Sequence, residues 1–222
     1  MIKLDKFILI ILIVTLSGCI AGPSLYMEAF SSSRQLVTDK ELVINEQIKK
    51  IPYAMKISRV GNSKEVLLVL VEARDEKLVW TSASKELITT YNGKIIKTVG
   101  LINDIEIRYY PDLLEVAKKI SINKKDNFKY KSLVSFSNPK ALSMDAYYTY
   151  SFVKDDVVIS RLNNRSIETF IIKEDLYIPL INFKSKNMYW VDNEFNVIKS
   201  EQKLVPNMKR IELTNLKKYS GK

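Results

Sequence analysis

The chain contains a single cysteine, and its surroundings indicate the one covalent modification that the sequence favours. Cys19 ends the tetrapeptide Leu16-Ser17-Gly18-Cys19, which directly follows an apolar stretch. Because there is no second cysteine, an intrachain disulfide is excluded and the thiol is free to act as an acceptor. The small residues before it give a peptidase access to the bond that precedes Cys19. We therefore expect Cys19 to carry a covalent modification other than a disulfide.

Residues 1–18 have the parts of an export signal, namely a positively charged start, an apolar centre and small residues at the end. The apolar centre, Phe7–Thr15, is about half the ~20 residues that a membrane-spanning helix needs. The segment resembles the lipobox signal of bacterial lipoproteins, which implies cleavage before Cys19 and acylation there. Two or more acyl chains give stable anchoring, whereas one gives only marginal binding. In the bacterial lipoproteins that this segment resembles, Asp directly after the cysteine favours retention in the inner membrane. Ile20 stands at that position here, so the resemblance implies the outer membrane as destination.

The rest of the sequence offers little for catalysis. The absence of histidine excludes the Ser-His-Asp triad and histidine-bearing metal sites, and there is no glycine-rich phosphate loop. Carboxylates remain, and we expect each acidic pair at a turn or strand end, where such residues are common. These pairs are Asp155-Asp156, Glu174-Asp175 and Asp192 with Glu194. We expect no catalytic residue, no metal ion and no cofactor.

Aromatic side chains are the candidates for stacking on sugar rings. In the predicted strand after residue 145, Tyr148, Tyr150 and Phe152 share one face and Tyr147 lies on the other. Packing within the sheet is the favoured alternative, because aromatic residues are common in strands. The same alternatives apply to Tyr109-Tyr110 and Tyr189-Trp190, and we expect Trp80 and Trp190 to anchor the core.

The secondary structure predicted to carry these side chains changes from helical to strand after residue 52. Residues 19–52 form a lipidated N-terminus and helical lead-in, with a helix predicted over 24–36, a linker over 38–42 and a short helix over 45–50. From Tyr53 onward the apolar residues recur at every second position, which is typical of strands. We therefore divide the chain into a signal peptide (1–18), the lead-in (19–52) and an antiparallel β domain (53–222).

The β domain contains many short strands with hairpin connections between them. Tyr91-Asn92-Gly93-Lys94 is the clearest hairpin turn, because Asn-Gly suits the positive φ angles of a type I′ turn. Val66–Val71 is apolar without alternation, which indicates a strand covered on both faces, with the N-terminal helix or another part of the sheet as cover. Strands are predicted over 54–59, 66–75, 77–81, 86–91, 94–101, 105–110, 129–137, 146–154, 157–161, 166–172, 180–186, 188–192, 197–204 and 209–216, with helical turns over 112–119. The prediction is a mainly all-β fold, a long antiparallel meander curled into a barrel or sandwich, with a short N-terminal helical segment.

The charge of the chain bears on its partners. The 35 Lys and Arg against 25 Asp and Glu give a net charge of +10, which attracts anionic molecules. For an exported protein these are lipid headgroups, lipopolysaccharide or acidic polysaccharide, and we expect no nucleic acid. The alternative is a solvated basic surface without a partner, because the positive residues are scattered along the chain.

Several short motifs, in this order and spacing, resemble the group 4 capsule polysaccharide lipoproteins of the GfcB/YjbF family. The resemblance covers the lipobox and residues 43–216, with Asn196 standing where the family has Gly in a turn. The motifs are Ile51-Pro52-Tyr53, Trp80, Tyr91-Asn92-Gly93-Lys94, Lys97-Thr98-Val99, Tyr189-Trp190-Val191-Asp192, Val197, Gln202 and Val205-Pro206. The resemblance implies a largely antiparallel β fold, a lipid anchor at the periplasmic face of the outer membrane, and an outer-membrane β-barrel protein as partner.

Three functions remain open at this point. The leading hypothesis is a non-enzymatic outer-membrane lipoprotein, accessory to capsule or exopolysaccharide secretion or assembly, that meets a β-barrel protein or an anionic polysaccharide. A lipid or lipoprotein carrier with an apolar half-barrel cavity is the second. An envelope polysaccharide-modifying enzyme is the third, and it requires two carboxylates that converge in a cleft.

Overall fold

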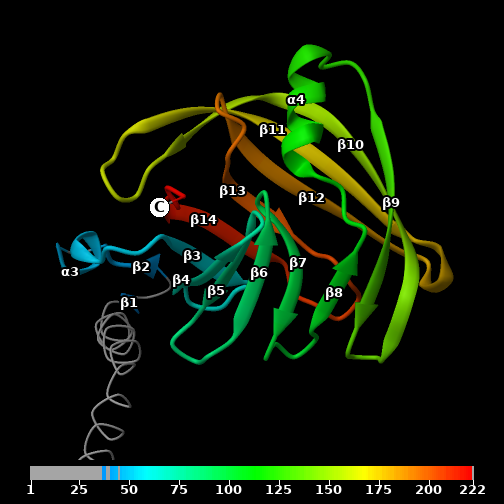
Figure 1. Cartoon of the computed structure of the whole chain (residues 1–222), viewed down its shortest axis with the longest axis horizontal. Helices are drawn as coiled ribbons and strands as arrows, with labels where there is room; N and C mark the ends of the chain where they lie inside the picture. The colour runs from blue at the N-terminus through cyan, green and yellow to red at the C-terminus, as the bar shows by residue number, and fades with distance from the viewer. Residues whose placement is uncertain (1–36, 39–40, 45, 222) are drawn as a thin grey trace, which may run out of the picture.

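The architecture is a closed antiparallel barrel of twelve strands, β3 to β14, in a computed structural model that describes residues 37–38, 41–44 and 46–221 (Figure 1). Each strand pairs with the next along the chain, and β14 closes the circle against β3. The barrel strands are β3 (Met55–Val60), β4 (Val66–Arg74), β5 (Lys77–Thr81), β6 (Leu87–Tyr91), β7 (Lys94–Val99), β8 (Ile105–Arg108), β9 (Phe128–Phe136), β10 (Ala141–Ile159), β11 (Ser166–Ile178), β12 (Phe183–Asp192), β13 (Val197–Gln202) and β14 (Ile211–Lys217). The predicted meander is confirmed, and it curls into a barrel.

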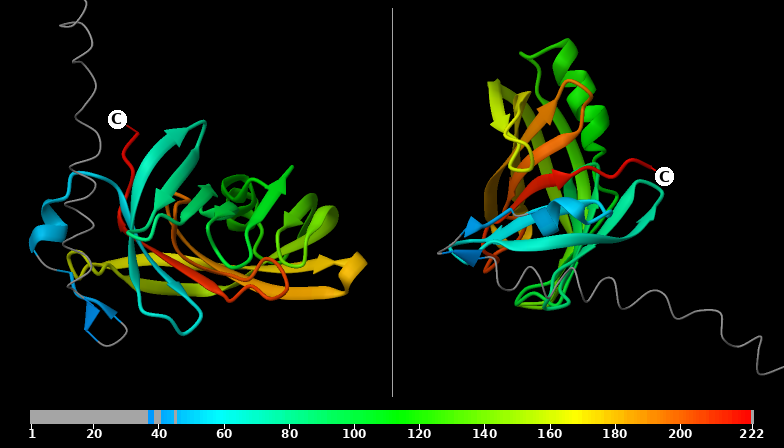
Figure 2. Two further views of the ribbon diagram at one scale, coloured as in Figure 1. Left: turned by 90° about the horizontal axis from the view of Figure 1, so that it is seen from below. Right: turned by 90° about the vertical axis from the view of Figure 1, so that its left-hand side faces the viewer.

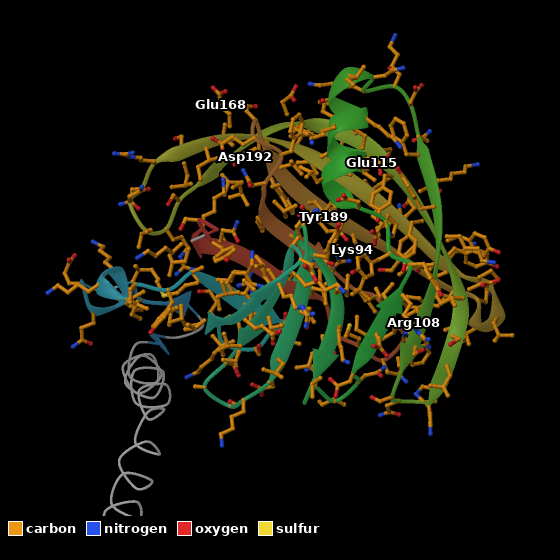
Figure 3. All side chains as sticks on the ribbon, in the orientation of Figure 1. Lys94, Arg108, Glu115, Glu168, Tyr189 and Asp192 are labelled. Carbon is orange, nitrogen blue, oxygen red and sulfur yellow. The ribbon has the colours of Figure 1, made fainter. Side chains whose placement is uncertain are left out.

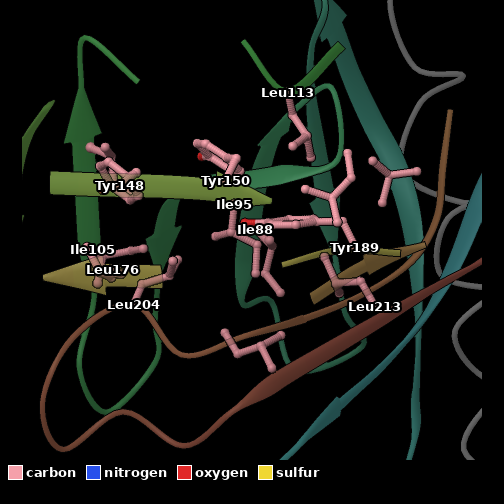
Figure 4. Close-up of a cluster of buried hydrophobic side chains, with 14 of the residues drawn as sticks. Ile88, Ile95, Ile105, Leu113, Tyr148, Tyr150, Leu176, Tyr189, Leu204 and Leu213 are labelled. Atoms are coloured by element: carbon pink, nitrogen blue, oxygen red, sulfur yellow. The ribbon is translucent and has the colours of Figure 1, made fainter. Parts of the chain in front are cut away.

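Alternation along the strands explains the barrel interior. In β10 the inward residues Met144, Ala146, Tyr148 and Tyr150 are buried, and the residues between them face outward. Aliphatic side chains from strands around the barrel fill the space between these residues (Figure 4). The interior is therefore a packed core, to which β10 and β11 contribute along much of the length of the molecule (Figure 2).

A single helix, α4 (Leu113–Ile122), joins β8 to β9 and adds to the core. Its residues Leu113, Val116, Ala117 and Ile120 are buried, and their spacing places them on one face. The N-cap carboxylate of Asp112 accepts from the Leu114 amide at 2.9 Å. The predicted helical turns at 112–119 are confirmed. None of the helices in the described ranges has both the length and the apolar composition that a membrane span requires.

A second, smaller cluster lies on the outside of the barrel wall. Leu42 and Ile48, from β2 (Glu41–Leu42) and α3 (Glu46–Lys50), pack with Met55, Ile57 and other apolar residues of the wall. The remaining buried members are Leu67, Val69 and Leu216. The segment Val66–Val71, predicted to be covered on both faces, lies in β4. The barrel core covers one face of this strand and the N-terminal lead-in covers the other, so the prediction is confirmed.

The tip of the β10–β11 hairpin reaches this lead-in. Arg161 donates to Glu65 Oε2 and to the Leu42 carbonyl, each at 2.6 Å, and the Leu42 amide donates to the same carboxylate at 2.9 Å. One ion pair thus fixes the backbone of β2 against the barrel. The length of β10 allows its hairpin to extend this far.

The structure corrects several predicted boundaries. A single strand, β10, runs through Asp155-Asp156, where a turn was predicted, and a β-bulge between Phe152 and Asp155 absorbs the extra residues. β11 continues past residue 172 to Ile178, a 3-10 turn (η1) occupies Pro179–Ile181, and β12 is one strand rather than two. At the segment predicted to be a linker, β1 (Val37–Thr38) pairs with β2 in an antiparallel arrangement. The helix predicted over 24–36 lies outside the described residues.

Two turns test the backbone predictions directly. Asn92 and Gly93 both have positive φ, 46° and 85°, as the predicted type I′ turn requires. In the turn after the Trp-Val-Asp segment, Phe195 has the positive φ (64°) and Asn196 does not. The turn therefore forms with Asn at position 196, and its positive φ lies one residue earlier. Asn196 instead donates from its backbone amide and its side chain to the carboxylate of Asp192.

Candidate functional site

Cys19, the predicted lipidation site, lies outside the described residues, so its modification stays a prediction. The acidic pairs predicted at turns are divided between the surface and the interior. Asp192 and Glu194 lie at the β12–β13 turn as expected, where Asp192 Oδ1 accepts from the Glu194 amide at 2.9 Å. Asp155 and Asp156 lie at the bulge of β10. Glu168 and Asp192 lie at the edge of the barrel, away from Lys94 and Tyr189 in its interior (Figure 3).

The two tryptophans differ in position. Trp80 is buried in the core, as predicted, and its Nε1 donates to Thr90 at 2.9 Å. Trp190 is only partly buried, which corrects its assignment to the core. Its Nε1 donates to Asp156 Oδ2 at 2.9 Å, and this hydrogen bond is the main cause that lowers the pKa of Asp156.

Glu174 contradicts the prediction of a turn, because it lies within β11 and points into the barrel. Its side chain is fully buried and pairs with the buried ammonium of Lys94, at the start of β7. Tyr150 and Tyr189 donate to Glu174 Oε2 at 2.5 and 3.2 Å, and Asn187 donates to Oε1 at 2.6 Å. Strands far apart in the sequence thus supply one buried polar network.

Gln202 extends this network to the β6–β7 turn. Its Oε1 accepts from the Ile95 amide at 3.0 Å, and its Nε2 donates to the Gly93 carbonyl at 3.1 Å. Burial lowers the pKa of Lys94, an effect that the charge of Glu174 opposes, and burial is also the main cause that raises the pKa of Tyr150. Every buried side-chain nitrogen and oxygen within the described ranges has a hydrogen-bond partner. The network is satisfied and shielded from solvent, so it holds β7 against β11–β13 and offers no access to a substrate.

A pocket of about 400 Å³ opens at one end of the barrel. The β3–β4, β5–β6, β7–β8 and β13–β14 connections surround it, at the end opposite to the α4 connection. Its floor includes the core residues Leu68, Ile88 and Ile211, and Ile102 at its rim is 88 % exposed. Lys209 and Glu86 are the charged residues of the lining. The pocket suits a small apolar group. Side chains fill the rest of the barrel interior, so the half-barrel cavity of the carrier hypothesis is reduced to this pocket.

A pair of accessible aromatic side chains with charged neighbours lies on the outside of β10 and β11. Tyr147 and Tyr177 face each other directly across the β10–β11 pair, and they are 42 % and 37 % exposed. Tyr147 pairs in register with Lys131 of β9, and Tyr177 with Lys184 of β12. Each of these four neighbouring strands therefore supplies one residue to a single row, which consists of Lys131, Tyr147, Tyr177 and Lys184. We call this row, with Lys129 and Lys186 beside it, the basic aromatic face.

The basic aromatic face contains a shallow hollow of about 530 Å³ that both tyrosines line. The ammonium of Lys131 lies 5.6 Å from the ring centre of Tyr147, and that of Lys184 lies 5.3 Å from that of Tyr177. Lys131 forms an ion pair with Asp145 at 2.8 Å. Within the described part of the chain, Lys129, Lys184 and Lys186 form no ion pair. They are therefore available to an anionic ligand.

The sequence anticipated part of this arrangement. Tyr148 and Tyr150 pack the interior and Tyr147 lies on the opposite face, as the alternation predicts. The sequence analysis missed Tyr177 and the four lysines, because their partners are set by cross-strand register. It also missed Lys94, since a lysine after an Asn-Gly turn gives no signal of burial. No group of three or more Cys, Asp or Glu residues in the described ranges is arranged to hold a metal ion.

Comparison with known proteins places this fold in a family. A profile of the family described as "Group 4 capsule polysaccharide lipoprotein gfcB, YjbF" matches residues 24–216. The uncharacterized lipoprotein GfcB of Escherichia coli (strain K12) is 23 % identical over 219 residues, which cover 95 % of this chain and 97 % of GfcB. The crystal structure of the hypothetical lipoprotein YmcC from Escherichia coli (K12) has the same fold, with a TM-score of 0.70, 22 % identity, and coverage of 90 % of this chain and 99 % of that one. The chain belongs to the group 4 capsule polysaccharide lipoprotein family of GfcB and YjbF.

Proposed function

We propose that this protein is a non-enzymatic lipoprotein, anchored at the periplasmic face of the outer membrane, that assists the secretion or assembly of a capsule or exopolysaccharide. The observation that carries the proposal is the family match over residues 24–216, which spans almost the whole barrel. The lipobox at Cys19 supplies the anchor, and Ile20 after it favours the outer membrane.

The non-enzymatic part of the proposal is supported by the distribution of reactive groups. The buried carboxylate of Glu174 is engaged by Lys94, Tyr150, Tyr189 and Asn187, with no path to a substrate. The surface carboxylate of Asp192 is engaged by its own turn. A polysaccharide-modifying enzyme needs an acid and a base that converge on one glycosidic bond. A rigid barrel on a lipid tether suits a role in holding a partner.

The anchor is tested by mass spectrometry of the protein purified from the membranes of the producing cell. We expect a mature chain that begins at an acylated Cys19, and we expect Cys19→Ser to leave the outer-membrane fraction. An unmodified thiol with residues 1–18 still attached would contradict the proposal.

The pathway is tested by deletion and co-purification. Cells without the protein should carry less surface polysaccharide, and the lipidated protein extracted in mild detergent should retain an outer-membrane β-barrel protein. Unchanged surface polysaccharide, together with recovery of the monomer alone, would count against an accessory role.

The end pocket favours a second candidate, a carrier of a small apolar ligand. Its volume of about 400 Å³ lies in the range of ligand pockets, roughly 300–1,000 Å³. Mass spectrometry of lipid extracts from the purified protein tests this candidate. A stoichiometric acyl compound that is lost in Ile88→Trp, which fills the floor of the pocket, would support the carrier. Extracts free of such a compound would leave the accessory role as the better account.

A further inference from the structure

We propose that the basic aromatic face binds a strand of acidic polysaccharide. The sugar rings stack on Tyr147 and Tyr177, and the carboxylates of the sugars pair with the lysines around these tyrosines. The inference rests on the proposed function, since it names the ligand class for a protein of the capsule pathway. The geometry supports this binding site, because four paired strands align their outward side chains in one row.

The first step is the exposure of the two tyrosines. The interior tyrosines of the same sheet, Tyr148, Tyr150 and Tyr189, are at most 1 % exposed, whereas Tyr147 and Tyr177 expose about two-fifths of their surface. Packing accounts for the interior rings, but it leaves this outward pair partly in water. Aromatic rings placed side by side on a rigid sheet offer apolar faces to the C–H groups of a sugar ring.

The second step is charge. Lys131 and Lys184 end the row, and Lys129 and Lys186 lie two residues along the same strands, on the same face. The carboxylate of Asp175, which lies between them, pairs with Lys173 at 2.8 Å. The face therefore presents an excess of positive charge, complementary to uronic acid carboxylates.

The third step is shape and access. Neighbouring strands lie about 4.8 Å apart, so the row of four residues spans about 14 Å, and its hollow of about 530 Å³ leaves room for sugar rings. The N-terminal lead-in packs on β3, β4 and β14, and it meets the tip of the β10–β11 hairpin at Arg161, at the end of β10 that is opposite to Tyr147 (Figure 1). The described residues of the lead-in therefore leave the face uncovered.

The test is equilibrium binding of the detergent-solubilised, lipidated protein to polygalacturonate oligosaccharides, with dextran of the same length as the neutral probe. We expect binding to polygalacturonate, weaker binding to dextran, and a log K that falls linearly with log salt concentration. The variant Tyr147→Ala/Tyr177→Ala should lose about tenfold in affinity, which corresponds to about 1.4 kcal/mol. Lys184→Gln/Lys186→Gln should lose at least as much and show a smaller salt dependence.

Inorganic polyphosphate and a matched variant serve as controls. Polyphosphate has charge without sugar rings, so its binding should weaken in the lysine variant and stay unchanged in the tyrosine variant. Tyr109→Ala removes a tyrosine that is 78 % exposed in the connection between β8 and α4, outside strands β9–β12, and it should bind polygalacturonate like the unmodified protein. Circular dichroism melting checks that all variants fold.

Three outcomes would overturn the proposal. These are equal affinity of the tyrosine variant and Tyr109→Ala, equal affinity for polygalacturonate and dextran, and loss of a co-purifying protein, rather than of glycan, from the tyrosine variant. The last outcome would make the face a protein interface. Unchanged surface polysaccharide in a deletion strain would instead overturn the proposed function and leave a measured glycan affinity standing, so the two failures are distinguishable.

Discussion

At the scale of single residues, the pair of Lys94 and Glu174 is the most consequential contact in the interior. Both side chains are fully buried, and each is the partner that compensates the charge of the other. Removal of one member of a buried pair leaves an uncompensated charge and typically costs about 3–5 kcal/mol. We expect Lys94→Met to lower the free energy of unfolding by that amount in urea denaturation.

Lys97→Met, on the same strand, is the matched control. Lys97 pairs with Glu106 at 3.5 Å, and both side chains are half exposed. Exposed pairs contribute at most about 1 kcal/mol, because water and salt screen them. Equal losses for Lys94→Met and Lys97→Met would show that the interior pair is not the clamp that its geometry indicates.

Lys56 makes stability depend on pH. It lies inside the barrel with its ammonium 4.8 Å from the ring centre of Trp80, and burial lowers its pKa from 10.5 to about 8. Between these two values the unfolded chain binds more protons than the folded chain, so the free energy of unfolding rises with pH. The full difference corresponds to about 3 kcal/mol. We expect urea midpoints to increase from about pH 8 towards pH 10.

Lys56→Met should reduce this increase and leave the part that comes from Lys94, whose pKa burial also lowers. Buried tyrosines act in the opposite direction. Burial raises the pKa of Tyr148, Tyr150 and Tyr189 above their usual value of 10. The stability that these tyrosines contribute is therefore present below pH 10, and it is lost only as the pH rises above 10. A flat pH profile for the unmodified protein, or the same rise in Lys56→Met, would contradict this assignment.

At the scale of elements, the β6–β7 turn connects the wall to the interior network. Gly93 has a φ of +85°, and a Cβ atom there would lie 2.4 Å from Cβ of Val197. Gly93→Ala therefore combines backbone strain of about 1–2 kcal/mol with a steric clash. We expect a larger loss of unfolding free energy than in Gly100→Ala, where φ is +89° but the nearest atom to a Cβ lies 3.6 Å away. Equal losses in thermal melts of the two variants would rule out the clash.

The elements also show which part of the fold the sequence predicts. Hairpins with local signals, such as the Asn92-Gly93 turn, were predicted because period-two patterns and turn residues act over a few positions. The breaks predicted near Glu174 and Asn187 were wrong because these polar residues face the interior. Their partner Lys94 is 80 positions from Glu174 in the sequence, so no local pattern reveals the contact.

The same reasoning applies to the candidate site. Alternation correctly separated Tyr147 from Tyr148 and Tyr150, because strand geometry alone sets the face on which a side chain lies. It could not align Tyr147 with Tyr177, since a shift of one residue in register would change every cross-strand partner. The basic aromatic face therefore emerges only from the pairing of β9–β12, whereas the predicted lipobox rests on adjacent residues alone.

At the scale of the whole molecule, the seam between β14 and β3 decides whether the barrel is closed. β14 contributes Ile211 and Leu213 to the interior and Leu216 to the outer cluster, each worth about 1.5–3 kcal/mol of burial. A chain that ends at Lys209 would expose the edges of β3 and β13, whose unpaired backbone groups invite association between molecules. We expect this chain to aggregate in size-exclusion chromatography and to lose its cooperative thermal transition. A chain that ends at Lys217 keeps the whole seam, so it should elute like the full chain and have an unchanged melting temperature. If the shorter chain stayed monomeric and melted cooperatively, closure by β14 would not be what holds the sheet in a barrel.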